Sequence, residues 1–524
     1  MNYVALFHAM LPETALEIAA LLVLFVDLAF LRRAALQARV ASAAFFGVVG
    51  CLFALWGIPA AGPYSYGNTV LLSAGGSAEV AQIAILVLTI LTLLLLIDST
   101  FTRNPGEYVS VVLMSAAGGL IISAAQDLLV IFTGLELLSL GLYILTAFAK
   151  QSGKSAESAL KYYLFGGMSA AFLLFGFSYL YGLSGSTSLP RVVLGANIAA
   201  SNGGGPLLLI ALVMIAVGLG FKVAAVPFHF WAPDAYEGAP APAAAFIASV
   251  SKVASFALLI SIGYAALHFF QILMPGANPA VSGSSMVLNT SAGGPQPPAA
   301  IVQYGWFLIL VVLSVASMVL GNLAALAQSS VRRLLAYSAI AHAGYILLGL
   351  AYLSWSNRIP QAVLYYILTY GLTTIGAFGV VGVVERSTGS DKLDSFLGLH
   401  KRNPILAAVL LVLVLSLAGI PPLVGFWAKF NVFAAVLHDL GGNLLIGQAA
   451  LPLALVALAI AMSAVSLYYY LQVLKRVYVL PPAGDSHIRV HPVTLLVLIA
   501  IAAAVLVLGC FPSLLQNWIA GFYS

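Results

Sequence analysis

Long apolar runs, separated by short polar breaks, constrain the fold of this chain more than any other feature of its sequence. A helix needs about 20 residues to cross the hydrocarbon core of a bilayer, and many of these runs reach that length. Hydrophobic residues make up 62% of the chain and charged residues 7%, whereas roughly 25% of an average soluble domain is charged. Strands of a membrane barrel alternate apolar and polar residues, and residues 405–417 do not. The sequence therefore predicts an all-α polytopic membrane protein.

Fourteen membrane-spanning helices are predicted when roughly 20 residues are allowed for each crossing. Their approximate bounds are 11–31, 38–60, 80–100, 107–124, 127–149, 158–182, 206–236, 240–270, 302–325, 330–353, 361–385, 404–438, 450–476 and 493–515. No basic segment precedes the first run, so it is predicted to be a helix and not a cleaved signal. The seventh and twelfth spans are overlong and hold Pro227, and Pro421 with Pro422, well inside. Because proline removes a helical hydrogen bond, both are predicted to be broken helices.

The basic residues predict the orientation, because short cytoplasmic loops are enriched in Lys and Arg. With the N-terminus outside, only Arg191 and Arg358 fall on the outer side. The inner set consists of Arg32, Arg33, Arg39, Arg103, Lys150, Lys154, Lys161, Arg332, Arg333, Arg386, Lys392, Lys401, Arg402, Lys475, Arg476 and Arg489. Both termini are therefore predicted to face outward. Because these residues lie in short loops and not on one soluble face, no nucleic-acid partner is predicted.

The two broken spans indicate an internal repeat. The segments VPFHFW at 226–231 and IPPLVGFW at 420–427 each place a proline four or five residues before a tryptophan. The broken spans are offset by five, an odd number, so the two units are predicted to run in opposite directions, as in inverted-repeat transporters. The predicted organisation is one membrane domain, 1–524, with inverted repeats at 107–270 and 302–476 and flanking helices within 11–100 and at 493–515.

The remaining segments add no predicted chemistry. The longest polar insertions are 183–205 and 276–300; the second carries no charge and is predicted to be a flexible outer loop. Cys51 and Cys510 lie inside apolar runs without metal-ligand spacing, so we expect both to be reduced core residues. The sequence contains no phosphate-binding glycine loop, metal cluster or nucleophile with its base, so it predicts no cofactor.

Five ionisable side chains are predicted at mid-membrane depth, where charge is costly. They are Glu136, Lys222, Lys252, His342 and Lys429, in spans 5, 7, 8, 10 and 12. A charged residue at a helix centre costs roughly 2.5–3.5 kcal/mol on insertion scales, so three such lysines must be paired, hydrated or used for their protonation. Glu136 cannot neutralise all three, and loss of water favours a neutral amine. The lysines are therefore predicted to exchange protons, with Glu136 as a counter-ion that holds or releases the proton of Lys222.

Two histidines are candidate accessory groups. His342 lies between Ser338 and Tyr345, each about one turn away, and is predicted to relay protons between the lysine sites. His229 is two turns after Lys222 and is predicted to continue the polar path on the same helix face. The alternative for each histidine is a packing role.

Lys161, in SALKYYLF, is closer to the inner end of its span. It is predicted either to extend its amine to the interface or to bridge Glu136 and Lys222, and the sequence leaves both readings open. For the whole set of buried charges, the alternative to proton transfer is a structural ion pair between Glu136 and one lysine.

Six segments carry a resemblance to a known family of membrane proteins. They are GLELLSLGLYIL (134–145), ALKYYLFGG (159–167), GLGFKVAAVPFHFWAPDAYEGAPAP (218–242), SKVASF (251–256), RRLLAYSAIAHAGY (332–345) and LSLAGIPPLVGFWAKF (415–430). Together they resemble the antiporter-like subunits of proton-pumping NADH:quinone oxidoreductase, respiratory complex I. The resemblance extends from about residue 11 to residue 480.

The resemblance implies a subunit that couples quinone reduction elsewhere in the complex to proton transfer. Its functional residues would be Glu136, Lys222, Lys252 and Lys429, with Lys161 and His342 as accessory groups. The fourteen spans and the lysine at 429 are most similar to the paralogue nearest the quinone-reducing arm. Flavin, iron–sulfur clusters and quinone would belong to partner subunits and not to this chain. The implied partners are the other membrane subunits of complex I, within the lipid bilayer of a bacterial inner membrane.

Three other functions remain open from the sequence. A subunit of a multi-subunit sodium/proton antiporter would share the broken-helix lysine motifs. A passive scaffold would use the buried charges only to hold helices together. A subunit related to membrane-bound hydrogenases is the third alternative.

Overall fold

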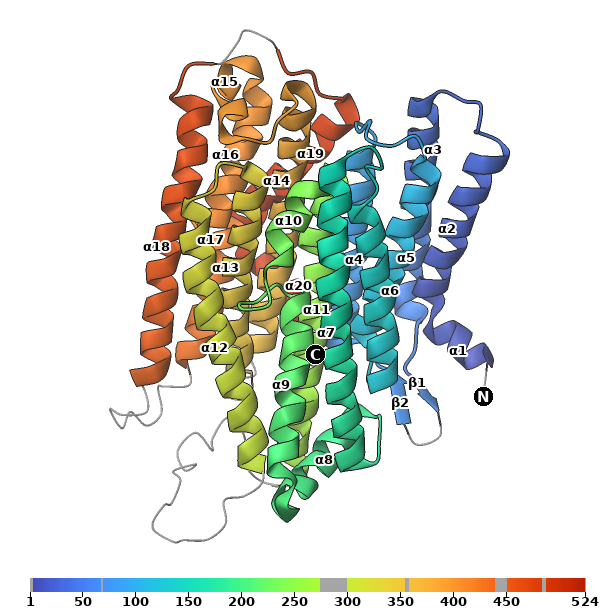
Figure 1. Ribbon diagram of the computed structural model, residues 1–524, viewed down its shortest axis with the longest axis vertical. Coiled ribbons are helices and arrows are strands. Elements are labelled where there is room, and N and C mark those ends of the chain that lie inside the picture. Colours follow the sequence, from blue (N-terminus) through green and yellow to red (C-terminus); the bar gives the residue numbers. More distant parts are fainter. Residues whose placement is uncertain are drawn as a thin grey trace.

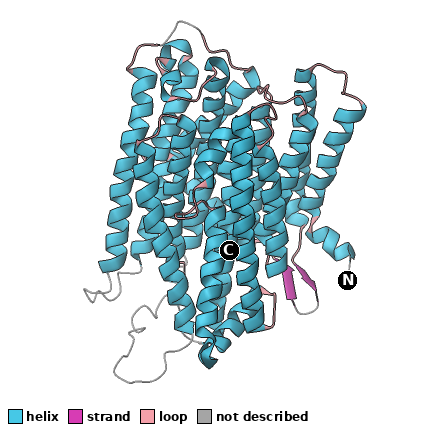
Figure 2. Ribbon diagram, viewed as in Figure 1, coloured by secondary structure: helices cyan, strands magenta, loops and turns pink. Residues whose placement is uncertain are grey.

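The computed structural model describes residues 3–66, 69–273, 299–353, 358–438, 450–482 and 487–523. Within these ranges the chain is a bundle of helices with one small hairpin at its periphery (Figures 1 and 2). Its first half comprises α1 (Tyr3–Ala9), α2 (Leu11–Ala29), α3 (Leu36–Gly57), β1 (Tyr64–Tyr66), β2 (Thr69–Leu72), α4 (Gly76–Leu96), α5 (Pro105–Ala124), α6 (Leu128–Thr146), α7 (Gly153–Ser184), α8 (Leu189–Ala199), α9 (Gly205–Lys222), α10 (Trp231–Gly238) and α11 (Ala241–Leu273).

The second half comprises α12 (Ala299–Leu326), α13 (Val331–Ala351), α14 (Ile359–Thr388), α15 (Leu399–Arg402), α16 (Pro404–Ala418), α17 (Val424–His438), α18 (Ala450–Tyr478), α19 (Pro492–Cys510) and α20 (Pro512–Gly521). Short 3-10 turns lie at Ile58–Ala60 and Leu393–Phe396, and a π-helical turn lies at Ala200–Gly204. The predicted outer loop 276–300 lies outside the described residues, except for its last two positions, which begin α12.

The all-α membrane architecture is confirmed. Within the described residues, 12 helices are long and apolar enough to cross a membrane, and the pair α1 and α2, bent by 81°, adds a thirteenth candidate. The half-helices α16 and α17 contain 15 residues each and flank the predicted break. At about 1.5 Å per residue, the two together supply the length of a fourteenth crossing.

Two features differ from the sequence expectation in detail. The predicted last span, 493–515, stops at Cys510, because Phe511 leaves the helical conformation and Pro512 begins the separate helix α20. Cys51 is buried as expected, but Cys510 is exposed at the end of α19, so its predicted core position is wrong. An apolar run reveals that a helix is membrane-embedded, but not which of its faces is covered by protein.

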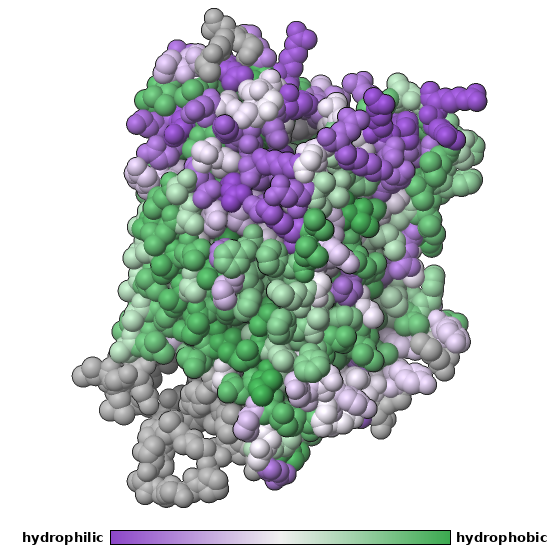
Figure 3. All heavy atoms as spheres, in the orientation of Figure 1, coloured by the Kyte–Doolittle hydropathy of each residue, from purple (hydrophilic) through white to green (hydrophobic). Residues whose placement is uncertain are grey.

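The molecule has a charged end, which is the end where α7 and α13 begin and α10 and α14 finish. Ion pairs join these helices: Lys154 to Glu237 at 2.7 Å and Arg333 to Asp234 at 2.7 Å. On the face seen in Figure 3, hydrophilic side chains gather at this end above an apolar belt. The basic residues predicted on one side of the membrane thus include those of this cluster.

Both predicted helix breaks are present. α9 ends at Lys222 and α10 begins at Trp231, and the segment between them includes Ala224 with a φ of 58°. α16 ends at Ala418, where Gly419 adopts a left-handed φ of 86° and donates its N–H to carbonyls of the last turn. Each break leaves carbonyl groups at the end of a half-helix without an intrahelical partner.

The most deeply enclosed helices are α11 and α13. In each, 94% of the membrane-spanning window is buried inside the protein, against 28% for α18 at the periphery. Lys252 lies on α11 and His342 on α13. The folding pattern therefore removes these two ionisable residues from both water and lipid.

Close packing of α5 on α6 depends on Gly118. A Cβ at this position would lie 2.5 Å from the backbone nitrogen of Leu138 and 2.9 Å from the carbonyl oxygen of Gly134. Gly167 of α7 has open space around it. Small residues at such contacts are a general means of bringing membrane helices together.

We expect Gly118→Ala to destabilise the folded protein by about 1–3 kcal/mol, the usual cost of overpacking. The matched variant Gly167→Ala should be neutral or stabilising by roughly 0.5–1 kcal/mol, because alanine favours helix over glycine. Thermal unfolding of each purified variant in detergent measures the difference. Equal unfolding temperatures for the two variants would contradict the packing argument.

Candidate functional site

Lys222 occupies the last turn of the half-helix α9. Its side chain is buried, and its Nζ donates a hydrogen bond to Ser139 Oγ on α6. The ammonium also lies 5.7 Å from the ring centroid of Phe221. A cation is favoured at this position because the helix C-terminus carries partial negative charge.

Glu136 lies one turn before Ser139 on α6 and is partly buried. It interacts electrostatically with Lys222, but among the described residues it forms no ion pair within 4.0 Å. The direct partner of Lys222 is therefore a neutral hydroxyl, with the predicted counter-ion held farther away. In this arrangement the carboxylate acts on Lys222 through its field and not through a contact.

Lys252 lies in the middle of α11 and reaches two backbone carbonyls. Its Nζ donates to Ala339 O of α13 at 2.6 Å and to Val223 O at 3.3 Å. Val223 directly follows Lys222 in the broken segment, so one residue connects the surroundings of the two lysines. The ring centroid of Tyr370 is 5.9 Å from the ammonium.

Lys429 is on α17, but it binds the end of the preceding half-helix. Its Nζ donates to Leu417 O at 3.2 Å and Ala418 O at 2.9 Å, the last two carbonyls of α16. A third hydrogen bond, of 2.8 Å, goes to Ser463 Oγ on α18. The Tyr345 ring centroid is 5.3 Å away.

The three buried lysines thus share one kind of environment. Each is held by carbonyl or hydroxyl oxygens, several of them freed by a helix break, and in the described structure none has a carboxylate within 4.0 Å. Neutral dipoles solvate an ammonium without leaving an uncompensated anion when the proton departs. This arrangement is chemically suited to amines that gain and lose protons. Among the described residues no three His, Cys, Asp or Glu side chains lie close enough together to hold a metal ion.

His342 interacts electrostatically with both Lys252 and Lys429. Its Nδ1 is 2.8 Å from the hydroxyl of Tyr366, and its Nε2 is 3.5 Å from that of Tyr470. The imidazole also interacts with the Leu417 carbonyl, which accepts from Lys429. Hydrogen bonds on both ring nitrogens suit a group that takes a proton on one side and gives it up on the other.

Sequence reasoning missed most of the partners of these residues. They are Ser139, Tyr366, Tyr370, Ser463 and Tyr470, and Asn322 is a further polar residue bonded to Tyr345. Asn322 donates to the Tyr345 hydroxyl at 3.0 Å and accepts from Tyr469, so it joins α12, α13 and α18. The available signal was the presence of tyrosine pairs inside otherwise apolar spans, because a buried tyrosine hydroxyl needs a partner.

Lys161 belongs to the charged end and not to the mid-membrane set. Its Nζ pairs with Glu157 at 2.7 Å and with Asp234 at 3.1 Å, and its side chain is 43% exposed. The described contacts of Lys161 include neither Glu136 nor Lys222. Of the two predictions for this residue, the geometry favours a position at the end of its span over the bridge.

His229 lies in the broken segment between α9 and α10. It is buried, and its Nδ1 has no hydrogen-bond partner among the described residues. The prediction that it continues the face of Lys222 is wrong, because the helix ends at Lys222 and helical spacing does not apply beyond it. Its ring is 6.5 Å from that of Tyr337 on α13.

At the charged end, by contrast, several carboxylates are in direct contact with bases. Glu237 accepts from Lys154 at 2.7 Å and from Arg333 at 3.0 Å. Burial raises the pKa of Glu237, but these two hydrogen-bonded cations lower it by more, so the pKa lies below its ordinary value. These ion pairs tie α7, α10 and α13 together.

Comparison with known proteins gives one family. The family described as "NADH:quinone oxidoreductase/Mrp antiporter, TM" matches residues 125–296 and 295–450. NADH-quinone oxidoreductase subunit N 2 of Acidobacterium capsulatum is 45% identical over 99% of both chains. NADH-quinone oxidoreductase subunit N 1 of Roseiflexus castenholzii is 37% identical over 87% of this chain and 81% of its own.

Solved structures give the same result for the fold. A chain of respiratory complex I from Thermus thermophilus is 31% identical, covers 97% of this chain and 98% of its own, and superposes with a TM-score of 0.72. A chain of an archaeal membrane-bound sulfane sulfur reductase reaches 0.78 at 22% identity, covering 99% of this chain and 96% of its own. A chain of the Mrp complex from Dietzia sp. reaches 0.74 at 20% identity, covering 97% and 96%. The last two similarities establish the fold alone.

The lowered pKa of Glu237 predicts an acid-sensitive charged end. Its charge stabilises the fold above the ordinary carboxyl pKa, and this contribution is lost as pH falls through the lower folded value. We expect the unfolding temperature of Glu237→Gln to fall less than that of the unchanged protein between neutral and acid pH. Asp394→Asn, at an 81% exposed position, is the control and should follow the unchanged protein. Identical pH profiles for all three proteins would contradict the assignment.

Proposed function

The chain belongs to the NADH:quinone oxidoreductase/Mrp antiporter transmembrane family, and we propose that it is the antiporter-like, proton-translocating subunit corresponding to subunit N of respiratory complex I. The resemblance expected from the sequence is confirmed by 45% identity along the whole chain to a subunit N and by 31% identity to a complex I chain. Its partners are the other membrane subunits of that complex. The observation that carries the mechanism is the set of three buried lysines held only by neutral oxygens.

In the proposed pathway a proton reaches Lys222 from the charged end and moves through Lys252 and His342 to Lys429, from which it is released on the opposite side. Glu136 sets the proton occupancy of Lys222. Two unit charges 4 Å apart interact by about 4 kcal/mol at an effective dielectric of 20, and by about half as much at twice the distance. A change of about 2 kcal/mol alters proton binding more than tenfold. A small movement of Glu136 therefore suffices to load or unload Lys222.

The enzyme as a whole couples this transfer to NADH:quinone oxidoreduction, and the chain contributes as a non-redox subunit of the translocase. Flavin, iron–sulfur clusters and quinone belong to partner subunits in this proposal. The residues that support it are amines, a histidine and hydroxyls, which transfer protons and not electrons. Redox energy reaches the subunit through its contacts with neighbouring subunits.

The charged end faces the inner side of a bacterial inner membrane, and both termini face outward. This proposal is supported by the excess of Lys and Arg in the loops of one side. Residues 107–270 and 302–476 are proposed to be inverted repeats. Both units contain the same series of membrane helices, which supports this proposal. The series is α5, α6, the long α7, the broken pair α9 and α10, and α11 in the first unit. In the second unit it is α12, α13, the long α14, the broken pair α16 and α17, and α18.

A sodium/proton antiporter subunit is the second candidate, since an Mrp complex chain has the same fold. The stronger identity to subunit N favours the first candidate. Proton pumping that persists when sodium is replaced by potassium supports the assignment. Sodium-dependent exchange by the purified complex without NADH oxidation overturns it.

Lys222 and Lys429 are the first and last lysines of the proposed pathway. Lys222→Ala and Lys429→Ala should each lower proton pumping by the assembled complex by about tenfold or more, because each removes a proton carrier. The measurement is pumping in vesicles during NADH oxidation, with assembly checked by the subunit content of the purified complex. The control Lys150→Ala removes a 65% exposed lysine at the charged end and should pump normally. Undiminished pumping by a normally assembled Lys222→Ala or Lys429→Ala complex would sink the proposal.

The role of His342 depends on its hydrogen bond with the Tyr366 hydroxyl. Tyr366→Phe removes the hydroxyl 2.8 Å from Nδ1, and we expect pumping to fall about fivefold, the equivalent of one hydrogen bond of about 1 kcal/mol. The neighbouring Tyr365 donates only a long 3.5 Å bond to Leu508 O, so Tyr365→Phe should retain pumping. Equal effects of the two substitutions would remove His342 from the pathway.

A further inference from the structure

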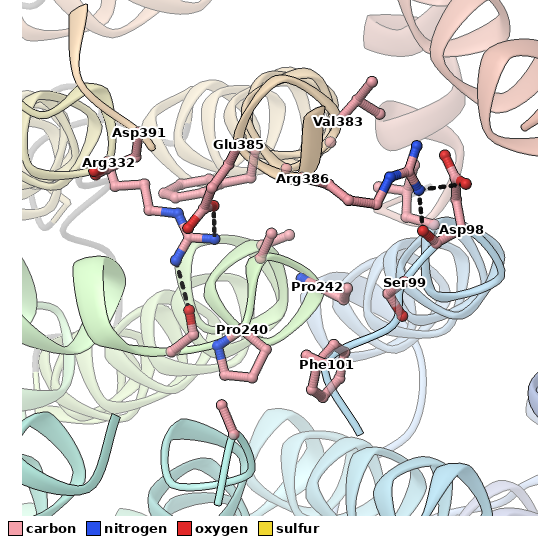
Figure 4. A pocket seen from close by; sticks show the side chains of 18 of the residues that line it. Asp98, Ser99, Phe101, Pro240, Pro242, Arg332, Val383, Glu385, Arg386 and Asp391 are labelled. Carbon is pink, nitrogen blue, oxygen red and sulfur yellow. Dashed lines mark hydrogen bonds and ion pairs between the residues drawn. The ribbon is translucent and has the colours of Figure 1, made fainter. Parts of the chain in front are cut away.

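A pocket of ≈ 340 Å³ opens at the charged end among α4, α10, α11 and α14 (Figure 4). Glu385 and Arg386, consecutive residues of α14, reach in opposite directions across it. Glu385 pairs with Arg332 at 2.5 Å, and Arg386 pairs with Asp98. The charged residues of the lining are four carboxylates and three bases: Asp98, Glu237, Glu385, Asp391, Lys154, Arg332 and Arg386. Arg333, outside the lining, also pairs with Glu237, so the wall of the pocket is polar and its acids and bases nearly balance.

The pocket descends between α11 and α14, where Ala245 and Phe378 contribute to its lining. The two helices run antiparallel and in contact. A Cβ on Gly382 would lie 2.7 Å from Ala241, and one on Gly371 would lie 3.5 Å from Val253. In this register Thr374 of α14 lies at the height of Ser249 of α11. Both are one helical turn farther from the charged end than Phe378.

Tyr370 of α14 and Lys252 of α11 lie one turn farther from the charged end. Tyr370 is one further turn along α14, and its ring centroid is 5.9 Å from the Lys252 ammonium. Two helical turns, about 11 Å, therefore separate the Phe378 level of the pocket from the buried amine. The mid-membrane hydrogen bonds of Lys252 described above do not involve this side of α11.

The intervening layer contains hydroxyl groups without partners. Thr374 is 2% exposed, and its Oγ1 interacts with the Tyr370 hydroxyl without reaching the geometry of a well-formed hydrogen bond. Tyr236 of α10 is fully buried, its ring packs 5.7 Å from that of Phe378, and its hydroxyl also has no partner in the described structure. Buried hydroxyls without a protein partner are normally satisfied by water. Ser249 adds a third hydroxyl, bonded to its own helix at Ala245 O.

We infer that this pocket is a second proton inlet, which delivers protons from the charged end to Lys252 without passing through Lys222. The inference rests on the proposed function, since it supplies a proton to a residue of the proposed pathway. Water between Thr374, Tyr236 and Ser249 passes an excess proton by exchanging O–H bonds, and the Lys252 amine accepts it. One proton enters and one N–H bond forms, with no oxidant or reductant involved. Phe378 is the apolar side chain that separates the pocket from this hydroxyl layer.

Thiol labelling tests the path without depending on pumping. Thr374→Cys is made in a background with Cys51 and Cys510 replaced by serine, and the assembled complex is treated with methanethiosulfonate ethylammonium from the charged end. We expect modification of the subunit, seen by mass, and slower modification when Phe378→Trp enlarges the apolar barrier. The control Thr373→Cys is equally buried, but its native hydroxyl is bonded within its helix to Thr369 O at 2.7 Å. Labelling of Thr374→Cys no faster than Thr373→Cys overturns the inlet.

Pumping then tests whether the path is used. Thr374→Val keeps the side-chain shape and removes the hydroxyl, so we expect pumping to fall several-fold and Thr374→Ser to restore it, while Thr373→Val pumps normally. Normal pumping by Thr374→Val overturns the inlet even if the cysteine is labelled. Lys429 follows Lys252 in the proposed pathway and so lies beyond both inlets. Normal pumping by Lys429→Ala therefore refutes the proposed function and leaves the labelling result intact.

Discussion

The binding of ammonium groups by neutral oxygens at broken helix ends is the interaction on which this structure depends. An unbroken helix uses most of its carbonyls internally, and those of its last turn have no intrahelical partner. The breaks after Lys222 and Ala418 create such ends within the membrane domain. Lys429 binds the end of α16, and Lys252 binds a carbonyl of the segment that follows α9. The partial negative charge of these ends offsets part of the cost of burying a cation.

The same bonds explain why the buried charges are suited to proton transfer. A carboxylate in direct contact would hold the proton on the amine and would be left unpaired when the proton departed. Ser139 and Ser463 provide oxygens without that penalty. Glu136 remains outside contact distance, where its field still acts on Lys222. In the proposed pathway, His342 and its tyrosine partners connect the lysines through groups that both donate and accept.

The charged end differs, because cations there are in direct contact with carboxylates. Arg333 meets both Asp234 and Glu237, and Arg332 meets Glu385, so these cations are held in direct contact with carboxylates. These pairs connect α10, α13 and α14, the helices that surround the pocket and position α11 within the bundle. Fixed ion pairs at one end thus hold in place a set of unpaired amines at mid-depth.

The sequence alone determined the membrane class, the spans, the two breaks and which side chains are ionisable at mid-depth, because run length, proline and charge are local properties. It did not determine the partners. The structure pairs Lys222 with Ser139 and Lys161 with Asp234. It also brings Thr374 of α14 level with Ser249 of α11. The two residues of each pair lie on helices that are distant in the chain. The apolar faces of α11 and α14 carry no periodic signal, since both helices are enclosed by protein on most sides. Only the packing of those helices decided which polar groups meet, because contact depends on rotation and register that one-dimensional patterns do not encode.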